Sequence, residues 1–285
     1  MIVLDGKKCA EDIFNQQLVQ VAAFGKAPRL AVVVVGKDPV VEKFIERKRK
    51  AAERIGVGFH VYPFEATISA NDLRTRVAEI VHEEKNTGVI IQLPLPKHIG
   101  KQHMLNAIVP SKDVDVLSSR ALGRVITGTS PIISPVAAAI KTLFTEYKIE
   151  YASKRIVIMG AGALVGKPVA LWFLSEGVGY SVVTERTPDG TRQLKEADII
   201  ISGIGKPKFI TGDMVKEGVV VLDFGSSFVE DPATKKRKTV GDVDFDAVKE
   251  KAEAITPVPG GVGPMLITML MASTVWSAKL AAGLV

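Results

Sequence analysis

The sequence predicts an α/β protein with two lobes, each built on a mainly parallel sheet with helices on its faces. Short apolar runs rich in Val and Ile alternate with segments of helical periodicity, first over residues 29–94 and again over residues 155–225. Buried parallel strands are continuous apolar runs, and helices usually connect them. The length of 285 residues suits one large domain or two of ordinary size. The repeated rhythm favours two.

The first half of the chain has the clearest order. Its apolar runs and amphipathic segments predict strand, helix, strand, helix and strand at residues 29–36, 41–56, 58–64, 71–84 and 88–94. Asn71 or Ser69 is suited to cap the second helix. From about 94 to 136 the periodicity weakens and Pro and Gly become frequent, so we expect irregular structure there.

A helix at 136–147 leads into the second half. The expected strands there are 155–160, 180–185, 197–205 and 218–225, with a helix at 164–177. The basic run 234–242 lies between two strand signals and is expected to be a solvated hairpin turn. An amphipathic helix near the C-terminus could return to the first lobe. We therefore assign the first domain to residues 1–137, completed by the helix within 263–285, and the second to residues 138–262, with a ligand-binding cleft between the lobes.

Composition narrows the classes of function. The net charge of +6 and sequence pI of about 9.2 permit an anionic ligand, and no nucleic-acid motif is present. The N-terminus lacks a signal-peptide pattern, and the apolar runs are too short to span a bilayer. Cys9 is the single cysteine, which suits a reducing cytoplasm, and the four histidines have no metal-ligand spacing. We expect no membrane or nucleic-acid partner and no metal.

One lysine on the predicted helix 41–56 stands apart from the other charges. At about 100° per residue, Val41, Phe44, Ile45, Ala52 and Ile55 share one face, and Lys48 lies on this face between Phe44 and Ile45. A lysine there can extend its ammonium to water along apolar surface, or it can serve a ligand site. The helix alone leaves both interpretations open.

A glycine motif indicates a dinucleotide-binding lobe. Gly160, Gly162 and Gly166 follow a predicted strand and open a predicted helix. Such glycines allow a tight turn, close approach of a pyrophosphate and close packing of the helix on the sheet. The next strand ends at Glu185 and Arg186, nineteen residues beyond the third glycine. An acidic residue there can bind the ribose of NAD and an arginine the 2′-phosphate of NADP, so these residues leave the cofactor open.

Three further stretches suggest a substrate site. Gln92 ends a predicted strand, where a neutral amide can bind a ligand at the carboxyl edge of a sheet. Asp113 and Asp115 lie in SKDVDV, and the stretch TPVPGGVGPM at 256–265 is too rich in Gly and Pro for regular structure. These stretches, with QLPLP, VGKDP, KRKAAERIG and the GKP at 205–207, resemble in order the bifunctional methylenetetrahydrofolate dehydrogenase/methenyltetrahydrofolate cyclohydrolase family. The resemblance covers nearly the whole chain.

The resemblance implies a folate enzyme with a Rossmann-type NAD(P)-binding domain and a folate-binding catalytic domain. Lys48 matches the central catalytic lysine, Gln92 its partner, and Asp115 the aspartate that binds the pterin. The substrate would be N5,N10-methylene-tetrahydrofolate, oxidised to the methenyl cation and hydrolysed to N10-formyl-tetrahydrofolate. Family habit implies a homodimer formed through the nucleotide-binding domain. The implied substrate contacts are Phe44, Lys48, Gln92, Asp115, Pro259, Gly260 and Gly261, and the implied cofactor contacts are Gly160, Ala161, Gly162, Val165, Gly166, Glu185, Arg186, Gly203, Gly205 and Asp223.

Several positions depart from the family pattern. Phe44 replaces a tyrosine and so lacks its hydroxyl, Val116 replaces a glycine, and Ala161 and Gly162 replace an arginine and a serine that could bind a 2′-phosphate. We expect NADP, with NAD possible. Three alternatives stay open: a member that keeps one of the two activities, a catalytically silent folate- or nucleotide-binding protein, and an unrelated two-lobe dehydrogenase of the amino-acid or shikimate type. The PGGVGPM stretch disfavours the last.

Overall fold

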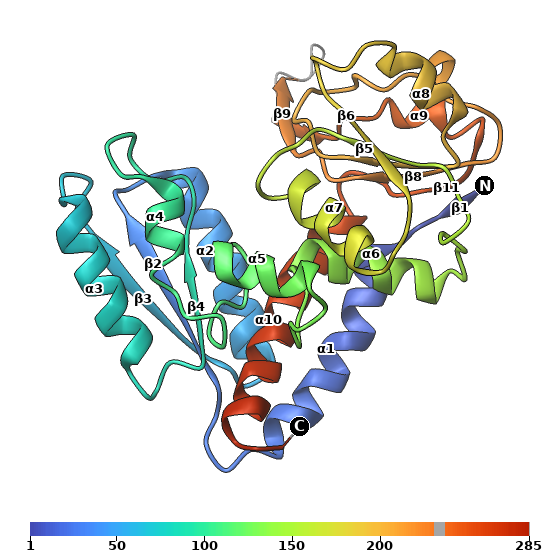
Figure 1. Cartoon of the computed structure of the whole chain (residues 1–285). Helices are drawn as coiled ribbons and strands as arrows, with labels where there is room; N and C mark the ends of the chain where they lie inside the picture. Colours follow the sequence, from blue (N-terminus) through green and yellow to red (C-terminus); the bar gives the residue numbers. More distant parts are fainter. Residues whose placement is uncertain (231–236, 285) are drawn as a thin grey trace. The chain divides into compact units, whose positions relative to one another are not determined.

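The structure, a computed structural model, describes residues 1–230 and 237–284. The chain divides into two compact units, shown in Figure 1. The glycine-loop unit consists of Met1–Ala10 and Val136–Leu266, and the lysine unit of Glu11–Pro135 and Ile267–Val285. Helices α1 (Gly6–Ala22) and α10 (Val262–Ala281) each contain one of the divisions. The two-unit α/β architecture confirms the fold class that the sequence predicts.

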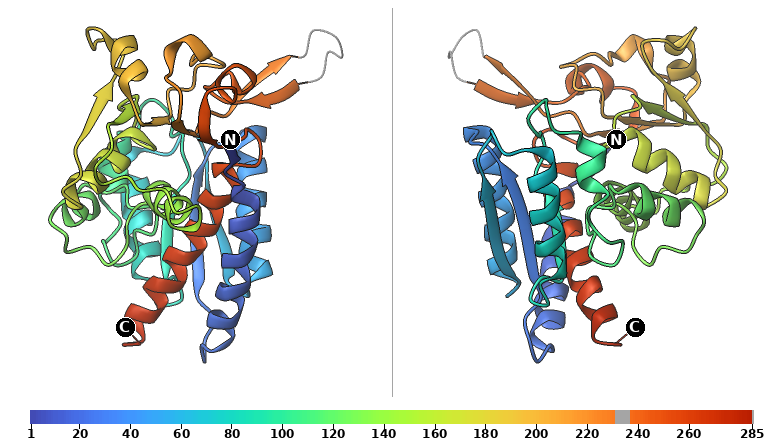
Figure 2. Two further views of the ribbon diagram at one scale, coloured as in Figure 1. Left: turned by 90° about the vertical axis from the view of Figure 1, so that its right-hand side faces the viewer. Right: turned by 60° about the vertical axis from the view of Figure 1, so that its left-hand side comes forward.

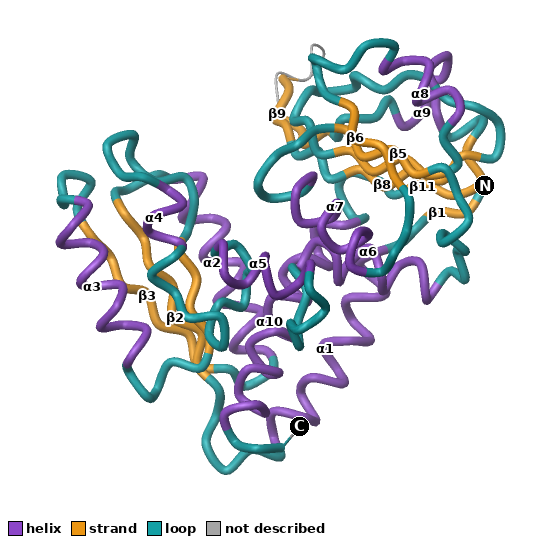
Figure 3. Tube along the Cα trace, in the orientation of Figure 1, coloured by secondary structure: helices purple, strands orange, loops and turns teal. Residues whose placement is uncertain are grey.

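The lysine unit is built on a three-stranded parallel sheet in the order β3-β2-β4. Its strands are drawn in orange in Figure 3. The strands are β2 (Arg29–Val35), β3 (Gly58–Phe64) and β4 (Gly88–Ile91), joined by α2 (Pro39–Arg54) and α3 (Ala70–His82). All five elements lie within a few residues of the expected ranges. Ser69, not Asn71, caps α3, because its hydroxyl accepts the Asp72 N–H at 3.1 Å.

An apolar core packs one face of this sheet against α3. The central strand β2 is buried almost throughout, with Ala31 and Val33 packed against Leu73 and Val77 of α3. The region of weak periodicity contains two short helices, α4 (Lys101–Leu105) and α5 (Ser119–Ile126). The core therefore fixes the carboxyl ends of β2 and β4, which carry the loops where a ligand is expected.

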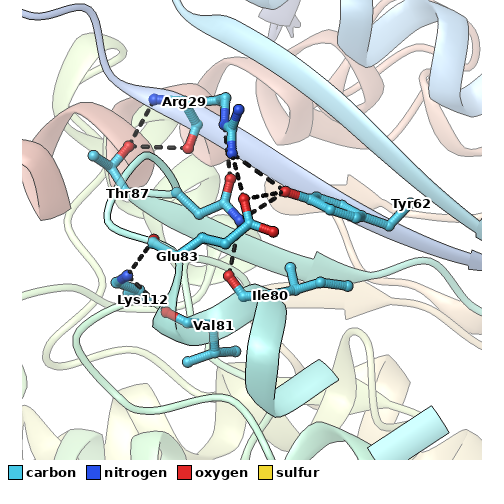
Figure 4. Close-up of polar contacts among 8 residues, drawn as sticks. Arg29, Tyr62, Ile80, Val81, Glu83, Thr87 and Lys112 are labelled. Atoms are coloured by element: carbon cyan, nitrogen blue, oxygen red, sulfur yellow. Dashed lines mark hydrogen bonds and ion pairs between the residues drawn. The ribbon is translucent and has the colours of Figure 1, made fainter. Parts of the chain in front are cut away.

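A polar network holds the opposite edge of the same sheet, shown in Figure 4. At the start of β2, the Arg29 guanidinium donates to Asn86 Oδ1 at 2.8 Å and to Glu83 at 2.9 Å. The Tyr62 hydroxyl donates to the same Glu83 carboxylate at 2.7 Å. Lys112 Nζ donates to the Val81 and Glu83 carbonyls, which lie at the C-terminal end of α3. These bonds satisfy the buried Asn86 amide and link it to partly exposed side chains around it, so we assign the cluster a stabilising role.

The glycine-loop unit is built on a six-stranded parallel sheet in the order β1-β11-β8-β7-β5-β6. Its strands are β1 (Ile2–Val3), β5 (Ile156–Met159), β6 (Tyr180–Val183), β7 (Ile199–Ser202), β8 (Val219–Asp223) and β11 (Ala252–Ile255). The helical segments are α6 (Pro135–Glu146), α7 (Gly166–Ser175), α8 (Gly190–Glu196), η1 (Gly212–Met214) and α9 (Phe245–Val248). The four strands expected from the sequence are present.

The N-terminal residues differ from the expected domain division. Ile2 pairs with Ala254 and Val3 with Ile255, and the Leu4 N–H donates to the Ile255 carbonyl at 2.9 Å. Residues 1–10 therefore belong to the glycine-loop unit and not to the first domain of residues 1–137. A two-residue strand is too short to show periodicity, which is why the sequence did not reveal it.

Residues 237–240 of the basic run form one strand of a hairpin, where the sequence predicted a turn. Strands β9 (Ser227–Glu230) and β10 (Arg237–Val240) pair antiparallel. Figure 2 shows this hairpin projecting from the sheet of its unit. The first residues of the predicted turn, 234–236, lie outside the described residues.

Helix α10 differs from the expectation that the apolar segments of this chain are too short to span a bilayer. Among the described residues it is the one helix long and apolar enough to cross a membrane, with a mean hydropathy of 1.2 over its most apolar 18 residues. However, 56% of that stretch is buried inside the protein. Gln17 of α1 donates to the Thr268 carbonyl of α10 at 3.1 Å, and Gly88 lies against Thr274. The composition therefore fits the core helix of a globular protein.

Candidate active site

Lys48 makes a specific contact in the lysine unit. Its half-buried side chain donates from Nζ to Gln92 Oε1 at 2.8 Å. Gln92 directly follows β4, its N–H bonds the Val33 carbonyl, and its amide nitrogen donates to the Leu93 carbonyl at 2.9 Å. This bond fixes the amide oxygen toward the lysine. The two residues that the sequence singled out, 44 positions apart, thus meet at the carboxyl edge of one sheet.

The face of α2 that carries Lys48 is only partly the apolar stripe predicted from the sequence. Ile45, Ala52 and Ile55 are buried. Phe44 is 39% exposed, and the Arg47 guanidinium lies 5.8 Å from its ring centroid. The Phe44 ring is therefore accessible to a ligand for apolar contact, but it has no hydroxyl that could form a hydrogen bond.

Asp115 lies in a tight turn organised by Asp113. The buried Asp113 carboxylate accepts the Ser118 N–H at 2.8 Å and the Leu117 N–H at 3.4 Å. Val116 has φ +55°, a left-handed conformation that is unusual for a β-branched residue. A glycine would adopt this conformation without strain, and here valine occupies the position. The turn presents Asp115 half-buried.

The charges of Lys48 and Asp115 influence each other. Burial lowers the pKa of Lys48 below its usual 10.5, and the nearby Asp115 carboxylate partly opposes that change. Burial also raises the pKa of Asp115, and Lys48 partly opposes it. A lysine with a lowered pKa is a better base near neutral pH than an exposed one. Lys48, Gln92 and Asp115 therefore provide a potential base, a neutral amide and a carboxylate.

The glycine loop has the geometry of a dinucleotide cradle. Gly160 has φ +94°, and a Cβ at Gly166 would lie 1.9 Å from the Gly160 carbonyl oxygen, so both positions need glycine. The space around Gly162 is open. No side chain caps the N-terminus of α7, so its amides are suited to an anionic group. The residues present therefore fit a pyrophosphate, as the sequence predicts.

The strand after this loop places Glu185 and Arg186 on the surface. Both side chains are exposed, and Glu185 forms an ion pair with Lys206 at 3.8 Å. Lys206 was not predicted as a site residue, although it follows Gly205 directly in the GKP motif. The lysine partly offsets the negative charge that Glu185 would present to a 2′-phosphate.

The remaining predicted cofactor residues lie at the carboxyl ends of β5, β7 and β8. Gly203 packs closely on Val165, because a Cβ at Gly203 would lie 2.7 Å from the Val165 Cβ. Asp223 is only 2% exposed, and its carboxylate accepts backbone N–H groups of Gly225, Asp242 and Val243 at 2.7–3.0 Å. Its carboxylate is thus engaged within the protein, and burial raises its pKa to about 6. Direct contact of Asp223 with a cofactor stays a prediction.

The loop after β11 contains the predicted residues Pro259, Gly260 and Gly261. Gly260 has φ +110° and accepts the Lys7 N–H at 3.1 Å, while a Cβ at Gly6 would lie 1.9 Å from the Gly261 carbonyl oxygen. Pro259 and Asp223 line one pocket of about 360 Å³ in this unit. Within residues 1–230 and 237–284, no group of His, Cys, Asp or Glu could hold a metal ion.

Comparison with known proteins decides the family. Residues 4–115 match the catalytic domain of tetrahydrofolate dehydrogenase/cyclohydrolase, and residues 134–282 match its NAD(P)-binding domain. The chain belongs to the tetrahydrofolate dehydrogenase/cyclohydrolase family. It is 39% identical over 282 residues to the bifunctional protein FolD of Nautilia profundicola, covering 98% of each chain. It is 40% identical over 281 residues to that of Lactococcus lactis, covering 98% of this chain and 97% of the relative.

Solved structures of family members agree. The bifunctional FolD methylenetetrahydrofolate dehydrogenase/cyclohydrolase of Campylobacter jejuni superimposes with a TM-score of 0.92 at 36% identity, covering 99% of both chains. The enzyme of Trypanosoma brucei, complexed with NADP and an inhibitor, gives 0.92 at 32% identity, covering 99% of this chain and 98% of that one. Shikimate 5-dehydrogenase of Thermus thermophilus reaches 0.54 at 16% identity, covering 89% of this chain and 99% of that one, which shows a shared fold alone. The predicted family and fold are confirmed.

Proposed function

We propose that this protein oxidises N5,N10-methylene-tetrahydrofolate to the methenyl form with NADP and hydrolyses the product to N10-formyl-tetrahydrofolate. The observation that carries this proposal is the hydrogen bond from Lys48 Nζ to Gln92 Oε1, in a chain whose glycine-loop unit has a dinucleotide cradle. Family membership supports both activities, because the relatives named above are bifunctional.

The hydrolytic step assigns a role to each polar residue. A water molecule adds to the methenyl carbon and gives up one proton to the base, which gives a neutral carbinolamine. The bond from that carbon to N5 then breaks as the formyl carbon–oxygen double bond forms, and the remaining hydroxyl proton passes to N5. Lys48 as the neutral amine takes the proton from that water, and its lowered pKa favours the neutral form. Gln92 holds the amine in place without adding charge. Asp115 accepts hydrogen bonds from the pterin amino and ring N–H groups, which are strong when the acceptor is ionised.

The oxidation relies on positioning by the protein. NADP, when bound, supplies the acceptor for the hydride of the one-carbon bridge. The glycine loop and the N-terminus of α7 hold its pyrophosphate, with Gly166 allowing the close packing of helix on strand. Phe44 offers an apolar ring at the substrate site. Since Gln92 orients Lys48, the hydroxyl that Phe44 lacks is not required for that contact.

NADP is favoured over NAD by the charges around the end of β6. Arg186 is exposed there, and Lys206 pairs with Glu185 at 3.8 Å. Two cations beside one carboxylate can accept a 2′-phosphate. The Trypanosoma brucei relative complexed with NADP adds support.

The assembly and location are part of the same proposal. We expect a homodimer formed through the glycine-loop unit, where Phe228 of β9 is 56% exposed. A cytoplasmic location suits a chain whose one cysteine cannot form an internal disulfide. We expect no nucleic-acid or membrane partner. Analytical ultracentrifugation and cell fractionation test these points, and a monomer at micromolar concentration contradicts the dimer.

The central test follows the two reactions separately. Wild-type protein is given methylene-tetrahydrofolate with NADP or NAD, and formation of the methenyl chromophore is recorded. Hydrolysis of supplied methenyl-tetrahydrofolate is recorded without cofactor. We expect both reactions, with NADP the better oxidant. Activity in only one assay would support a single-activity member, and activity in neither, with folate still bound, would support a silent binding protein.

A further inference from the structure

Two buried carboxylates connect the strand ends that face the dinucleotide site. Asp223 is 2% exposed and Asp242 is 0% exposed. Asp223, at the end of β8, accepts the Asp242 and Val243 N–H groups, and its own N–H donates to Thr256 Oγ1 at 2.8 Å. The pair therefore ties β8, the loop after β10 and the end of β11 together.

Glycines make room for both carboxyl groups. A Cβ at Gly241 would lie 1.9 Å from Asp223 Oδ2, and one at Gly225 would lie 2.5 Å from Asp242 Oδ1. Burying two carboxylates this closely is costly, as the raised pKa of Asp223 shows, with Asp242 contributing to it.

Asp242 reaches the loop after β7. Its Oδ2 accepts the Ser202 hydroxyl at 2.9 Å and the Ile204 N–H at 2.8 Å. Ile204 lies between Gly203 and Gly205, both predicted to contact the cofactor. The Ile204 Cγ2 atom lies 3.1 Å from the point where a Cβ of Gly160 would be, so the side chain packs on the first glycine of the cradle.

We propose that Asp242 is a positioning residue for dinucleotide binding, acting through the Ile204 N–H to hold Ile204 against Gly160. Because Asp242 is fully buried, it does not itself touch a cofactor. Asp223 holds the backbone of Asp242 and so completes the path. The inference rests on the proposed NAD(P)-dependent function.

The test compares four proteins by direct titration with NADP and with NAD. Asp242→Ala removes the acceptor and should weaken binding of both cofactors about three- to thirtyfold. Asp242→Asn keeps a carbonyl oxygen where Oδ2 lies and should restore affinity to within about threefold of wild type. Ser202→Ala removes only the second donor to Oδ2 and should leave affinity within about twofold.

Two measurements separate positioning from loss of fold. The rate of methenyl-tetrahydrofolate hydrolysis, which needs Lys48 and no cofactor, should be unchanged in Asp242→Ala. Hydrogen exchange of the Ile204 amide should accelerate in Asp242→Ala and stay slow in Asp242→Asn. If Asp242→Ala does not fold, Ile204→Ala tests the same contact without altering either carboxylate, and it should weaken NADP binding about three- to thirtyfold.

The outcomes distinguish the two proposals. Wild-type protein that binds neither NADP nor NAD overturns the proposed function. Wild-type protein that binds, with unchanged affinity in Asp242→Ala or in Ile204→Ala, overturns the positioning role. Equal losses in Asp242→Asn and Asp242→Ala also overturn it, because the amide retains the acceptor for the Ile204 N–H.

Discussion

Lys48 Nζ donates a hydrogen bond of 2.8 Å to Gln92 Oε1. The lysine comes from the middle of α2 and the glutamine from the first position after β4. A charged ammonium and a neutral amine can both donate this bond, so it holds the side chain in either protonation state. The contact thus orients a base without preventing its titration.

Replacing Lys48 by Met should abolish methenyl hydrolysis, because the general base is lost while the apolar stem is kept. General-base catalysis contributes about a hundred- to ten-thousandfold, which sets the expected loss. Circular dichroism and thermal melting should remain close to wild type, since Lys48 is only half-buried. Lys50→Met is the matched control on the same helix, because its ammonium is exposed beside Glu46. Hydrolysis at the wild-type rate in Lys48→Met contradicts the assignment.

Asp115 and Gln92 should affect different kinetic parameters. Losing a charged hydrogen bond costs about 1.5–3 kcal/mol, so Asp115→Ala should weaken folate binding about ten- to a hundredfold. Gln92→Ala removes the acceptor that orients the Lys48 amine and should mainly lower kcat. Fluorescence titration with a folate and steady-state kinetics measure the two effects. A normal folate affinity in Asp115→Ala refutes its pterin role.

The pH dependence of hydrolysis should follow Lys48. Burial lowers its pKa and disfavours the ammonium, so the active neutral amine increases as pH rises, with a midpoint below 10.5. Asp115 raises the pKa of Lys48. Removing its charge in Asp115→Asn should therefore shift the midpoint to lower pH, in kcat and in an NMR titration of the isotopically methylated lysine. A shift to higher pH would mean that the carboxylate does not act on Lys48 as the structure indicates.

Val116 should reverse the usual order of two small substitutions. A glycine variant of a protein is normally less stable than the alanine variant at the same position. However, Val116 has φ +55°, a conformation that Gly adopts without strain. Both Val116→Gly and Val116→Ala lose most of a buried side chain. The glycine variant should therefore be more stable than the alanine variant by about 1 kcal/mol in urea unfolding. The opposite order would show that the turn relaxes to negative φ when the side chain shrinks.

Arg186 and Lys206 should govern the choice of cofactor. Each bond to a phosphate is charge-assisted, so Arg186→Ala should weaken NADP by about 1–2 kcal/mol and leave NAD nearly unchanged. Lys206→Gln should also favour NAD, because it leaves Glu185 without its partner at 3.8 Å. Paired titrations with both cofactors measure the ratio. Equal losses for NADP and NAD, or binding of NAD alone by wild type, would exclude the preference for NADP.

The helices, strands and motifs of this protein follow from local patterns in its sequence. Strands β2, β3 and β4 and helices α2 and α3 were predicted within a few residues, because periodicity is a local property of the chain. The glycine loop was equally local, since one strand, one turn and one helix contain it. The position of Lys48 on a partly apolar face followed from helical geometry alone.

Which of these residues contact one another depends on the tertiary fold. The pairing of β1 with β11 joins residues about 250 positions apart, and a two-residue strand is too short for its sequence to predict that pairing. The ion pair of Lys206 with Glu185 and the hydrogen bond from the Ile204 N–H to Asp242 also join separate segments of the chain, and no local pattern predicts them. The Asp223 carboxylate accepts three backbone N–H groups, which the sequence did not reveal, and its contact with a cofactor stays a prediction. Long-range contacts depend on how sheets and loops pack, and that information is distributed over the whole chain rather than held in any one segment.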